Sequence, residues 1–199
     1  MSGALAVAAV SAVLKDLLDN RVAQPDVASS VGDVTVTALP PDRIAVGADE
    51  RNQLNLFLYR VTPRATLTRL DQAPGNGANG HAPRPLSLDL HYLLSAHGQQ
   101  DFHAEVLLGC GIQVMHETPV LTAELLRTSL SSSSTRGGSG TKAALAASGI
   151  AERAEQITIA PEFLSTDETS RLWSALQARY RPSVTYRVSS IPIDLNDGP

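Results

Sequence analysis

The sequence of 199 residues contains a single cysteine, Cys110, so the chain cannot form a disulfide within itself. One free thiol is typical of proteins that fold in a reducing compartment. Aromatic residues are also scarce, at 4%, so leucine, valine, isoleucine and alanine must fill most of the core. Long hydrophobic runs are missing as well, since no stretch reaches the length that crosses a bilayer.

An excess of charge of either sign is missing too. The formal net charge is −4 and the isoelectric point is near 5.7, which argues against a broad surface for nucleic acid or anionic membranes. The apolar start, residues 4–14, is similar to the middle of a signal peptide, but it lacks a basic n-region and a cleavage site. We therefore expect a cytoplasmic protein that binds neither nucleic acid nor membrane.

Helical periodicity is present in several parts of the sequence. Residues 3–21 carry apolar side chains at three- and four-residue spacing, which predicts an amphipathic helix. Similar spacing recurs at about 101–116 and again at about 120–130. Ser165 and Glu168 form the pattern of a capping box, so a further helix is expected to begin there.

Short alternating or apolar runs predict strands, which are expected at 34–37, 53–62, 86–95, 156–160 and 183–191. The run at 53–62 is apolar on both faces at its centre, which predicts an inner strand. Helices and strands interleave without strict βαβ repetition, so the predicted fold class is α+β: a mixed, mainly antiparallel sheet packed by three or four helices. Residues 1–199 form one predicted domain, with mobile loops at 71–85 and 131–149.

A glycine-rich stretch contains one motif that is also found in cofactor sites. Gly75, Gly77 and Gly80 have the spacing of a dinucleotide fingerprint. That mechanism needs a strand before the glycines and a helix directly after them. Pro74 precedes the glycines and Pro83 follows them closely, so no helix can begin there cleanly. We expect a loop at this place and no cofactor.

Four of the five histidines lie in one stretch, namely His91, His97, His103 and His116. Their spacing matches no common zinc pattern, and thiolate partners are missing. Asp89 and His91 share one face of a predicted strand, so a carboxylate–imidazole pair is within geometric reach. The favoured interpretation is exposed polar decoration of a strand, without a bound metal.

Nucleophiles are equally poorly supported. Cys110 lies between Gly109 and Gly111 in a helical stretch, where small residues favour close packing of the helix. No positive neighbour marks Cys110 as a reactive thiolate. The serines at 131–134 and Ser139 lack the Gly-x-Ser-x-Gly elbow of serine hydrolases. The sequence therefore predicts no catalytic residue and a protein that is not an enzyme.

Four segments, taken together and in order, are similar to a known family. They are NLFLYRVTP at 55–63, RPLSLDLHYLL at 84–94, LLG, MH and PVLT within 107–122, and LWSAL and YRPSVTY within 172–186. In this order and spacing, from the first helix to about Ile193, the chain resembles the N-terminal domain of cap proteins of extracellular contractile injection systems. The antifeeding prophage and the virulence-cassette particles are the familiar examples.

The resemblance implies a structural subunit with a fold like that of phage tail terminators. Such proteins form a hexameric ring that closes the distal end of a stacked inner tube and its contractile sheath. The implied partners are further copies of the same chain, the tube protein and the sheath protein, within an assembled injection particle. Two alternatives stay open: a tail-completion protein of a contractile-tailed phage, and a small hydrolase or metal-binding module that uses Asp89, His91 or Cys110.

The expected interface consists of arginines and of residues in the last strand, namely Arg60, Arg181, Tyr186, Arg187, Ile191 and Ile193. Arginine is enriched at interfaces and bridges carboxylates with two hydrogen bonds. The last strand and the tail, 183–195, are expected to offer an edge to which an arm of the sheath protein adds as a strand. The loops at 71–85 and 131–149 are expected to become ordered on contact with a neighbour.

Overall fold

One mixed sheet forms the centre of the fold. The computed structural model describes residues 2–64, 86–131, 139–153 and 156–193, and its strands lie in the order β1-β2-β3-β6-β5-β4. Neighbouring strands are antiparallel except β1 and β2, which run parallel. The predicted fold class is therefore confirmed. The strands are β1 (Thr35–Thr37), β2 (Gln53–Pro63), β3 (Leu86–His97), β4 (Val120–Leu121), β5 (Ile157–Glu162) and β6 (Ser183–Ile193).

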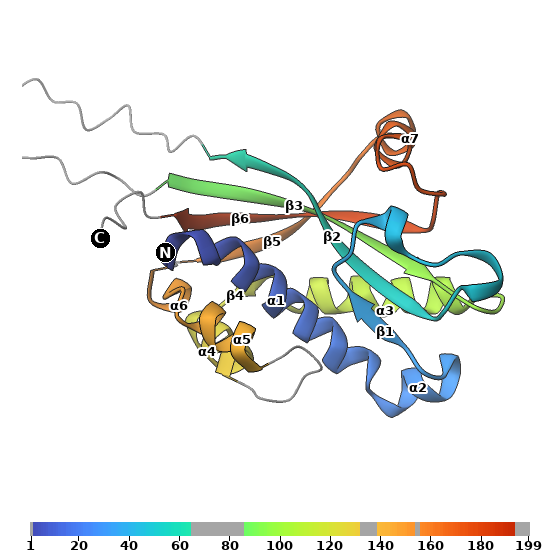
Figure 1. The fold of residues 1–199 in the computed structure, drawn as a ribbon, viewed down its shortest axis with the longest axis horizontal. Coiled ribbons are helices and arrows are strands. Elements are labelled where there is room, and N and C mark those ends of the chain that lie inside the picture. The colour runs from blue at the N-terminus through green and yellow to red at the C-terminus, as the bar shows by residue number, and fades with distance from the viewer. Residues whose placement is uncertain (1, 65–85, 132–138, 154–155, 194–199) are drawn as a thin grey trace, which may run out of the picture.

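Most of the helices gather on one face of the sheet. Figure 1 shows α1 and α3 along that face, with α4, α5 and α6 grouped beside α1, while α7 stands on the opposite side near one end of the sheet. We call the face covered by α1 and α3 the inner face, and the opposite one the outer face. The helices are α1 (Ser2–Val22), α2 (Pro25–Val31), α3 (His103–Glu117), α4 (Ala123–Ser131), α5 (Ser139–Ala146), α6 (Ile150–Arg153) and α7 (Thr166–Ala175), with short 3-10 turns η1 (Pro41–Arg43) and η2 (Gly47–Asp49).

The core lies between α1, α3 and the inner face. Val10, Leu14 and Leu18 follow one another at every fourth residue of α1, and all are fully buried, as the predicted amphipathic helix requires. Tyr92 of β3 points to the same side, and its hydroxyl lies 2.8 Å from Ser11 Oγ of α1. This buried phenol therefore has the partner that a buried polar group needs.

Glycine lets α3 approach the sheet closely. A Cβ atom at Gly111 would lie 2.8 Å from Leu94 Cδ2, which is closer than real side chains come, and Leu54 is the next neighbour. A Cβ atom placed at Gly109 would have no atom of the described residues within 4 Å, apart from its own helix backbone and its chain neighbours. The predicted close packing is thus confirmed at Gly111 and not at Gly109.

Strand β2 is buried on both faces only where β1 covers its edge. Leu54 and Leu56 on one face and Asn55 on the other are buried, whereas Arg60 and Val61 are exposed. Because β1 pairs only with residues 53–55, the remainder of β2 is an edge within the described part of the chain. The predicted inner strand is confirmed for its first half alone.

Several other boundaries differ from the prediction. The stretch at 120–130 begins with β4, which pairs with β5, and only then turns into α4. The stretch at 131–149 contains α5 in its second half, since alanine and leucine there are good helix formers despite the serine and glycine that surround them. The loop predicted at 71–85 lies outside the described residues. The short helices α2, α5 and α6 add to the ones that the sequence predicts.

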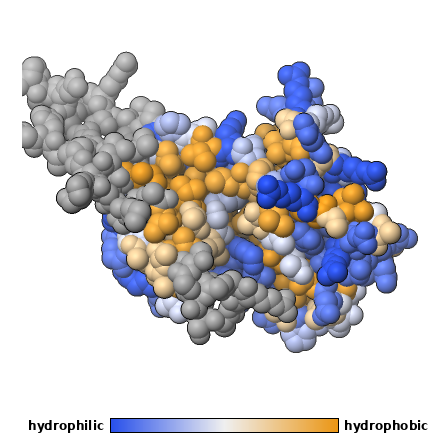
Figure 2. All heavy atoms as spheres, in the orientation of Figure 1, coloured by the Kyte–Doolittle hydropathy of each residue, from blue (hydrophilic) through white to orange (hydrophobic). Residues whose placement is uncertain are grey.

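The surface in Figure 2 is seen from the side of α1. Hydrophobic residues gather there over the half of the molecule that holds the N-terminal part of this helix. Leu5 and Val7 of this part are half-buried and pack against the core, so the colouring follows the core helix. Among the described residues, no helix combines the length and the apolar character that a bilayer crossing demands.

Candidate assembly surface

A bulge in β2 brings two adjacent side chains to the outer face. Leu58 lies opposite Tyr92 in the pairing of β2 with β3, but Arg60 lies opposite His91, so Tyr59 is an extra residue in β2. Bulges of this kind redirect side chains. The ring of Tyr59 consequently packs edge-on against His91, with ring centroids 6.1 Å apart.

His91 is the centre of a hydrogen-bonded group on the outer face, where it is 3% exposed. Its Nδ1 lies 2.8 Å from Glu162 Oε2, and its Nε2 lies 2.9 Å from Thr62 Oγ1. Arg60 Nη2 donates to Glu162 Oε1 at 3.2 Å, and the Tyr59 hydroxyl donates to Glu162 Oε2 at 3.1 Å. We call these residues, Tyr59, Arg60, Thr62, His91 and Glu162, the outer-face cluster.

The prediction of His91 as exposed decoration is wrong. β3 is a central strand, so the side chains of both neighbouring strands flank His91 on the outer face. Its carboxylate partner is Glu162 from β5 and not Asp89. Asp89 instead lies 3.6 Å from Arg64 Nη1 and accepts a hydrogen bond from the backbone of Ser190 at 3.4 Å.

Burial and charge set the protonation of the outer-face cluster. Burial raises the pKa of Tyr59 to about 12, and the negative charge of Glu162 adds to this effect. Burial by itself would also raise the pKa of Glu162, but hydrogen bonds from His91 and Tyr59 and the charge of Arg60 lower it below its ordinary value. The carboxylate is therefore ionised and the phenol neutral at neutral pH.

The order Thr62, His91, Glu162 is that of hydroxyl, imidazole and carboxylate in a nucleophilic triad. Acyl transfer also needs a cavity for the substrate and donors for the developing oxyanion. Of these three residues, Glu162 lines one of two cavities beside α7, but Thr62 and His91 line neither. Arg60 Nη2 also lies 3.2 Å from His91 Nδ1 and shares the same carboxylate. The geometry fits a fixed link between β2, β3 and β5 better than a catalytic site.

A second polar group lies at the end of the outer face. Arg181 Nη2 donates to Glu50 Oε2 at 2.7 Å, and His97 Nδ1 lies 3.9 Å from Glu50 Oε1. Both ring nitrogens of His97 and the hydroxyl of Ser95 are buried without a hydrogen-bond partner among the described residues. Burial lowers the pKa of His97, and the charge of Arg181 lowers it further. We call Glu50, His97 and Arg181 the sheet-end cluster.

The remaining candidates for metal or thiol chemistry are scattered. His103 Nδ1 lies 3.0 Å from Asn52 Oδ1, and His116 is exposed in the last turn of α3. Cys110 is half-buried, and burial raises the pKa of its thiol, which opposes thiolate reactivity. Within the described ranges, no three histidine, cysteine, aspartate or glutamate residues come close enough to hold a metal ion.

The last strand is an inner strand, which changes its expected role. β6 pairs with β3 on one side and with β5 on the other, so the prediction of an edge over 183–195 is wrong wherever both pairings exist. On the side of β5, residues 183–184 and 190–193 of β6 lack a paired strand within the described chain. Tyr186 and Ile191 belong to the buried core, and Ile193 packs against it. Their interface role stays a prediction, with little surface to support it.

The three arginines expected at an interface have different surroundings. Arg60 is 50% exposed and is paired with Glu162. Arg181 is 23% exposed and is held by Glu50. Arg187, opposite His91 in the sheet, is exposed on the outer face. Arg60 and Arg187 therefore expose charge on the outer face, whereas Arg181 is held by a contact within the chain. The interface role of all three stays a prediction.

Exposed aromatic residues are the feature that sequence reasoning missed. Phe163 is 90% exposed, Phe102 is 75% exposed and Tyr180 is 62% exposed. Large exposed apolar side chains mark interaction sites in many proteins. One signal was available for Phe163, because it lies between the strand predicted at 156–160 and the helix predicted to begin at Ser165, where no periodicity would bury it. Phe102 falls inside the helix predicted at about 101–116, and no such signal marks it.

Comparison with known proteins identifies the family of this chain and a protein of similar structure. The sequence matches the family described as the Pvc16 N-terminal domain over residues 9–198. The chain belongs to this family. Its structure is similar to the sheath/tube terminator, in the extended state, of an extracellular contractile injection system called PVC: the TM-score is 0.54 and the identity 18%, over 96% of this chain and 57% of that chain.

The cap of the anti-feeding prophage, a tube terminating cap, is matched with a TM-score of 0.47 and 19% identity, over 86% of this chain and 52% of that chain. No curated protein matches the sequence. This member of the Pvc16 N-terminal domain family thus spans little more than half the length of the terminator that it matches. The resemblance to the cap proteins is confirmed, and with it the terminator-like fold.

Proposed function

We propose that this chain is a structural subunit that terminates the inner tube and the sheath of a phage-tail-like contractile injection system. The observation that carries the proposal is the family match over residues 9–198, together with a fold similar to that of a sheath/tube terminator. In this proposal six copies form a ring at the distal end of the tube. The ring contacts tube protein and sheath protein, and it acts by binding and not by turnover.

The central sheet is suited to the subunit of a closed ring. Residues 91–97 of β3 are all buried, and residues 91–95 are paired with strands on both sides. The outer-face cluster adds side-chain links between β2, β3 and β5. A ring built from one chain needs such rigid subunits, because the interface rotation must repeat until the ring closes.

The free edge of β2 is the better place for an added strand. β1 pairs with residues 53–55 only, so the remainder of β2 lacks a second neighbour within the described residues. Exposed edges can accept a strand from another chain. In the proposed particle, an arm of the sheath protein adds to this edge, or to the shorter free segment at 190–193 of β6.

The proposal is tested with the purified chain, first alone and then mixed with inner tubes assembled from purified tube protein. Light scattering gives the mass in solution, and negative-stain images show where the chain binds. Six-membered rings, free or at one end of the tube, are the expected result. A chain that leaves both tube ends bare, and does not limit tube length during assembly, contradicts the proposal.

A further inference from the structure

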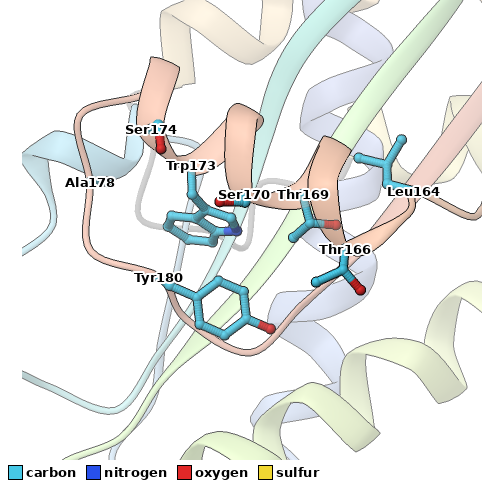
Figure 3. Close-up of a pocket in the computed structure, with 8 residues that line it drawn as sticks. All are labelled: Leu164, Thr166, Thr169, Ser170, Trp173, Ser174, Ala178 and Tyr180. Atoms are coloured by element: carbon cyan, nitrogen blue, oxygen red, sulfur yellow. The ribbon is translucent and has the colours of Figure 1, made fainter.

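Two cavities flank α7. The larger, of about 440 Å³, opens between α7 and the segment that leads into β6, and Trp173 and Tyr180 are among its lining residues (Figure 3). The smaller, of about 230 Å³, lies between α7 and the outer face of the sheet. We call the smaller one the hollow. Its volume is below that of most small-molecule sites, so it suits a single side chain better than a cofactor.

The lining of the hollow is mainly apolar. Leu93 and Thr185 lie opposite each other in the pairing of β3 with β6 and line it from the sheet. Leu172 of α7 lines it from the other side, together with Phe163 and Leu164. Phe163 is 90% exposed, so apolar surface continues from the hollow to the outside of the molecule. Covering such a surface with an apolar group removes it from water, which is favourable.

A free arginine lies beside the hollow. Arg187 follows Thr185 by two residues in β6, so both side chains are on the outer face, about 7 Å apart along the strand. Arg187 is exposed, and it forms no hydrogen bond or ion pair with any residue that the structure describes. Its neighbour in β5 is Ala160, whose small side chain leaves the guanidinium open to an approaching carboxylate.

The carboxylates of this face are already paired. Glu162, which also lines the hollow, accepts a hydrogen bond from Arg60, and Asp89 lies 3.6 Å from Arg64. The two acidic side chains are 20% and 16% exposed, whereas their arginine partners are 50% and 47% exposed. The charge that this face presents to the outside is therefore positive, and Arg187 adds to it. A partner with complementary charge is acidic.

We propose that an extended segment of a different protein docks along β6 on the outer face. An apolar side chain of this segment fills the hollow, and an aspartate or glutamate two positions away binds Arg187. Alternate residues of an extended chain point the same way and lie about 7 Å apart, which matches the separation of Thr185 and Arg187. The inference rests on the proposed function, in which tube protein and sheath protein are the available partners.

Another copy of this chain does not offer a matching segment within the described residues. Its large hydrophobic side chains that are exposed have no aspartate or glutamate two positions away on either side. They are Leu39, Val46, Val61, Phe102, Val106, Ile112, Phe163 and Tyr180. The occupant is therefore assigned to a different chain of the particle.

Photocrosslinking identifies the segment directly. The photoreactive amino acid p-benzoylphenylalanine, placed at position 163 instead of Phe163, keeps an aromatic ring at the rim of the hollow. The chain is bound to tube and sheath assembled from purified proteins, irradiated and digested, and mass spectrometry locates the cross-link. It should lie in one segment of a partner protein, at or beside an apolar residue that is two positions from aspartate or glutamate. The same amino acid in place of Phe102, which is 75% exposed, is the matched control and should not capture this segment.

A charge variant tests the second half of the contact. Arg187→Gln, combined with the photoreactive residue at position 163, removes a charge-assisted hydrogen bond and should lower the yield of this cross-link about tenfold. Arg179→Gln is the matched control, since Arg179 is exposed and lines neither cavity. It should leave the yield unchanged.

Three results overturn the inference: an unchanged yield with Arg187→Gln, a captured segment without a carboxylate two positions from an apolar residue, and capture of another copy of this chain. Binding of the chain at tube ends without any cross-link from position 163 also overturns it and leaves the proposed function standing. A wild-type chain that does not bind tube or sheath contradicts the proposed function, and the docked segment with it.

Discussion

His91 and Glu162 lie 71 residues apart in the sequence, yet Nδ1 of the histidine and Oε2 of the glutamate are separated by 2.8 Å. Strand β6 runs between the two strands that carry them, so the contact bridges over a strand. Arg60 of β2 binds the same carboxylate. The outer-face cluster thus links β2, β3 and β5 at the middle of the sheet.

Replacing Glu162 with glutamine should weaken these links between the strands. Glu162 has a folded-state pKa below its ordinary 4.5, so its contribution to stability is present above pH 4.5 and is lost as pH falls through the folded-state pKa. At pH 7 we expect Glu162→Gln to lower the free energy of unfolding by about 1–3 kcal/mol. Urea unfolding at pH 7 and at pH 3 measures both effects, and the variant should lose less than the wild type between the two pH values.

Glu105→Gln, at an exposed position of α3, is the matched control for this change. It should leave the free energy of unfolding at pH 7 nearly unchanged. An equal loss in both variants would show that the outer-face cluster has no special role.

Because His97 is buried, we expect a second, separate loss of stability on acidification. Burial and Arg181 lower its pKa below the ordinary 6.5, while Glu50 faces it from the other side. The unfolded chain therefore binds a proton at His97 more readily than the folded chain does. The contribution of His97 to the free energy of unfolding is complete above pH 6.5 and is lost as pH falls toward the folded-state pKa. His97→Asn should flatten the decline between pH 7 and pH 5.5, measured by urea unfolding. His116→Asn, on the exposed end of α3, should keep the decline of the wild type.

The sequence predicts those features of the fold that depend on residues close to one another along the chain. The alternation at 86–95 predicts β3 and the inward direction of Tyr92, because strand periodicity is a local property. It cannot predict that His91 is buried on the outer side, since the residues that cover it come from β2 and β5. Their positions depend on the strand order and on the extra residue Tyr59, neither of which leaves a pattern in the sequence.

The capping box is the opposite case, because its partners are three residues apart. Ser165 Oγ accepts from the backbone of Glu168 at 3.2 Å, and the Glu168 carboxylate accepts from the backbone of Ser165 at 2.8 Å, as the sequence predicts. The cavity beside α7 was beyond sequence reasoning. It depends on how Tyr180, which follows the helix, folds back against Trp173.

Ser165→Ala should fray the helix that carries the cavity. Loss of an N-cap side chain typically removes about 1 kcal/mol of stability. Since α7 stands at the end of the sheet (Figure 1), the effect should be local, with faster amide exchange in α7 and little change in β3. Hydrogen exchange measures this, and Ser174→Ala on the same helix is the control. Uniformly faster exchange throughout the chain would contradict a local cap.

The two glycines of α3 should respond in opposite ways to the same change. Gly109→Ala adds a methyl group to open space and should stabilise the helix by about 0.5–1 kcal/mol. Gly111→Ala gains the same propensity but pushes a methyl group against the buried Leu94, and overpacking costs about 1–3 kcal/mol. Thermal unfolding should place Gly111→Ala clearly below Gly109→Ala. Equal stabilisation by both would show that Leu94 moves aside freely.

Arg181 and Arg187 should separate stability from assembly. Arg181 donates to Glu50 at 2.7 Å, so Arg181→Ala leaves a carboxylate without its partner and should lower the free energy of unfolding by about 1–3 kcal/mol. Arg187 is exposed on the outer face, and Arg187→Ala should change stability by no more than about 0.5 kcal/mol. If the outer face contacts the particle, Arg187→Ala should nevertheless reduce the fraction of chain that cosediments with tube and sheath. Unchanged cosedimentation would move the interface away from Arg187 and toward the free edge of β2.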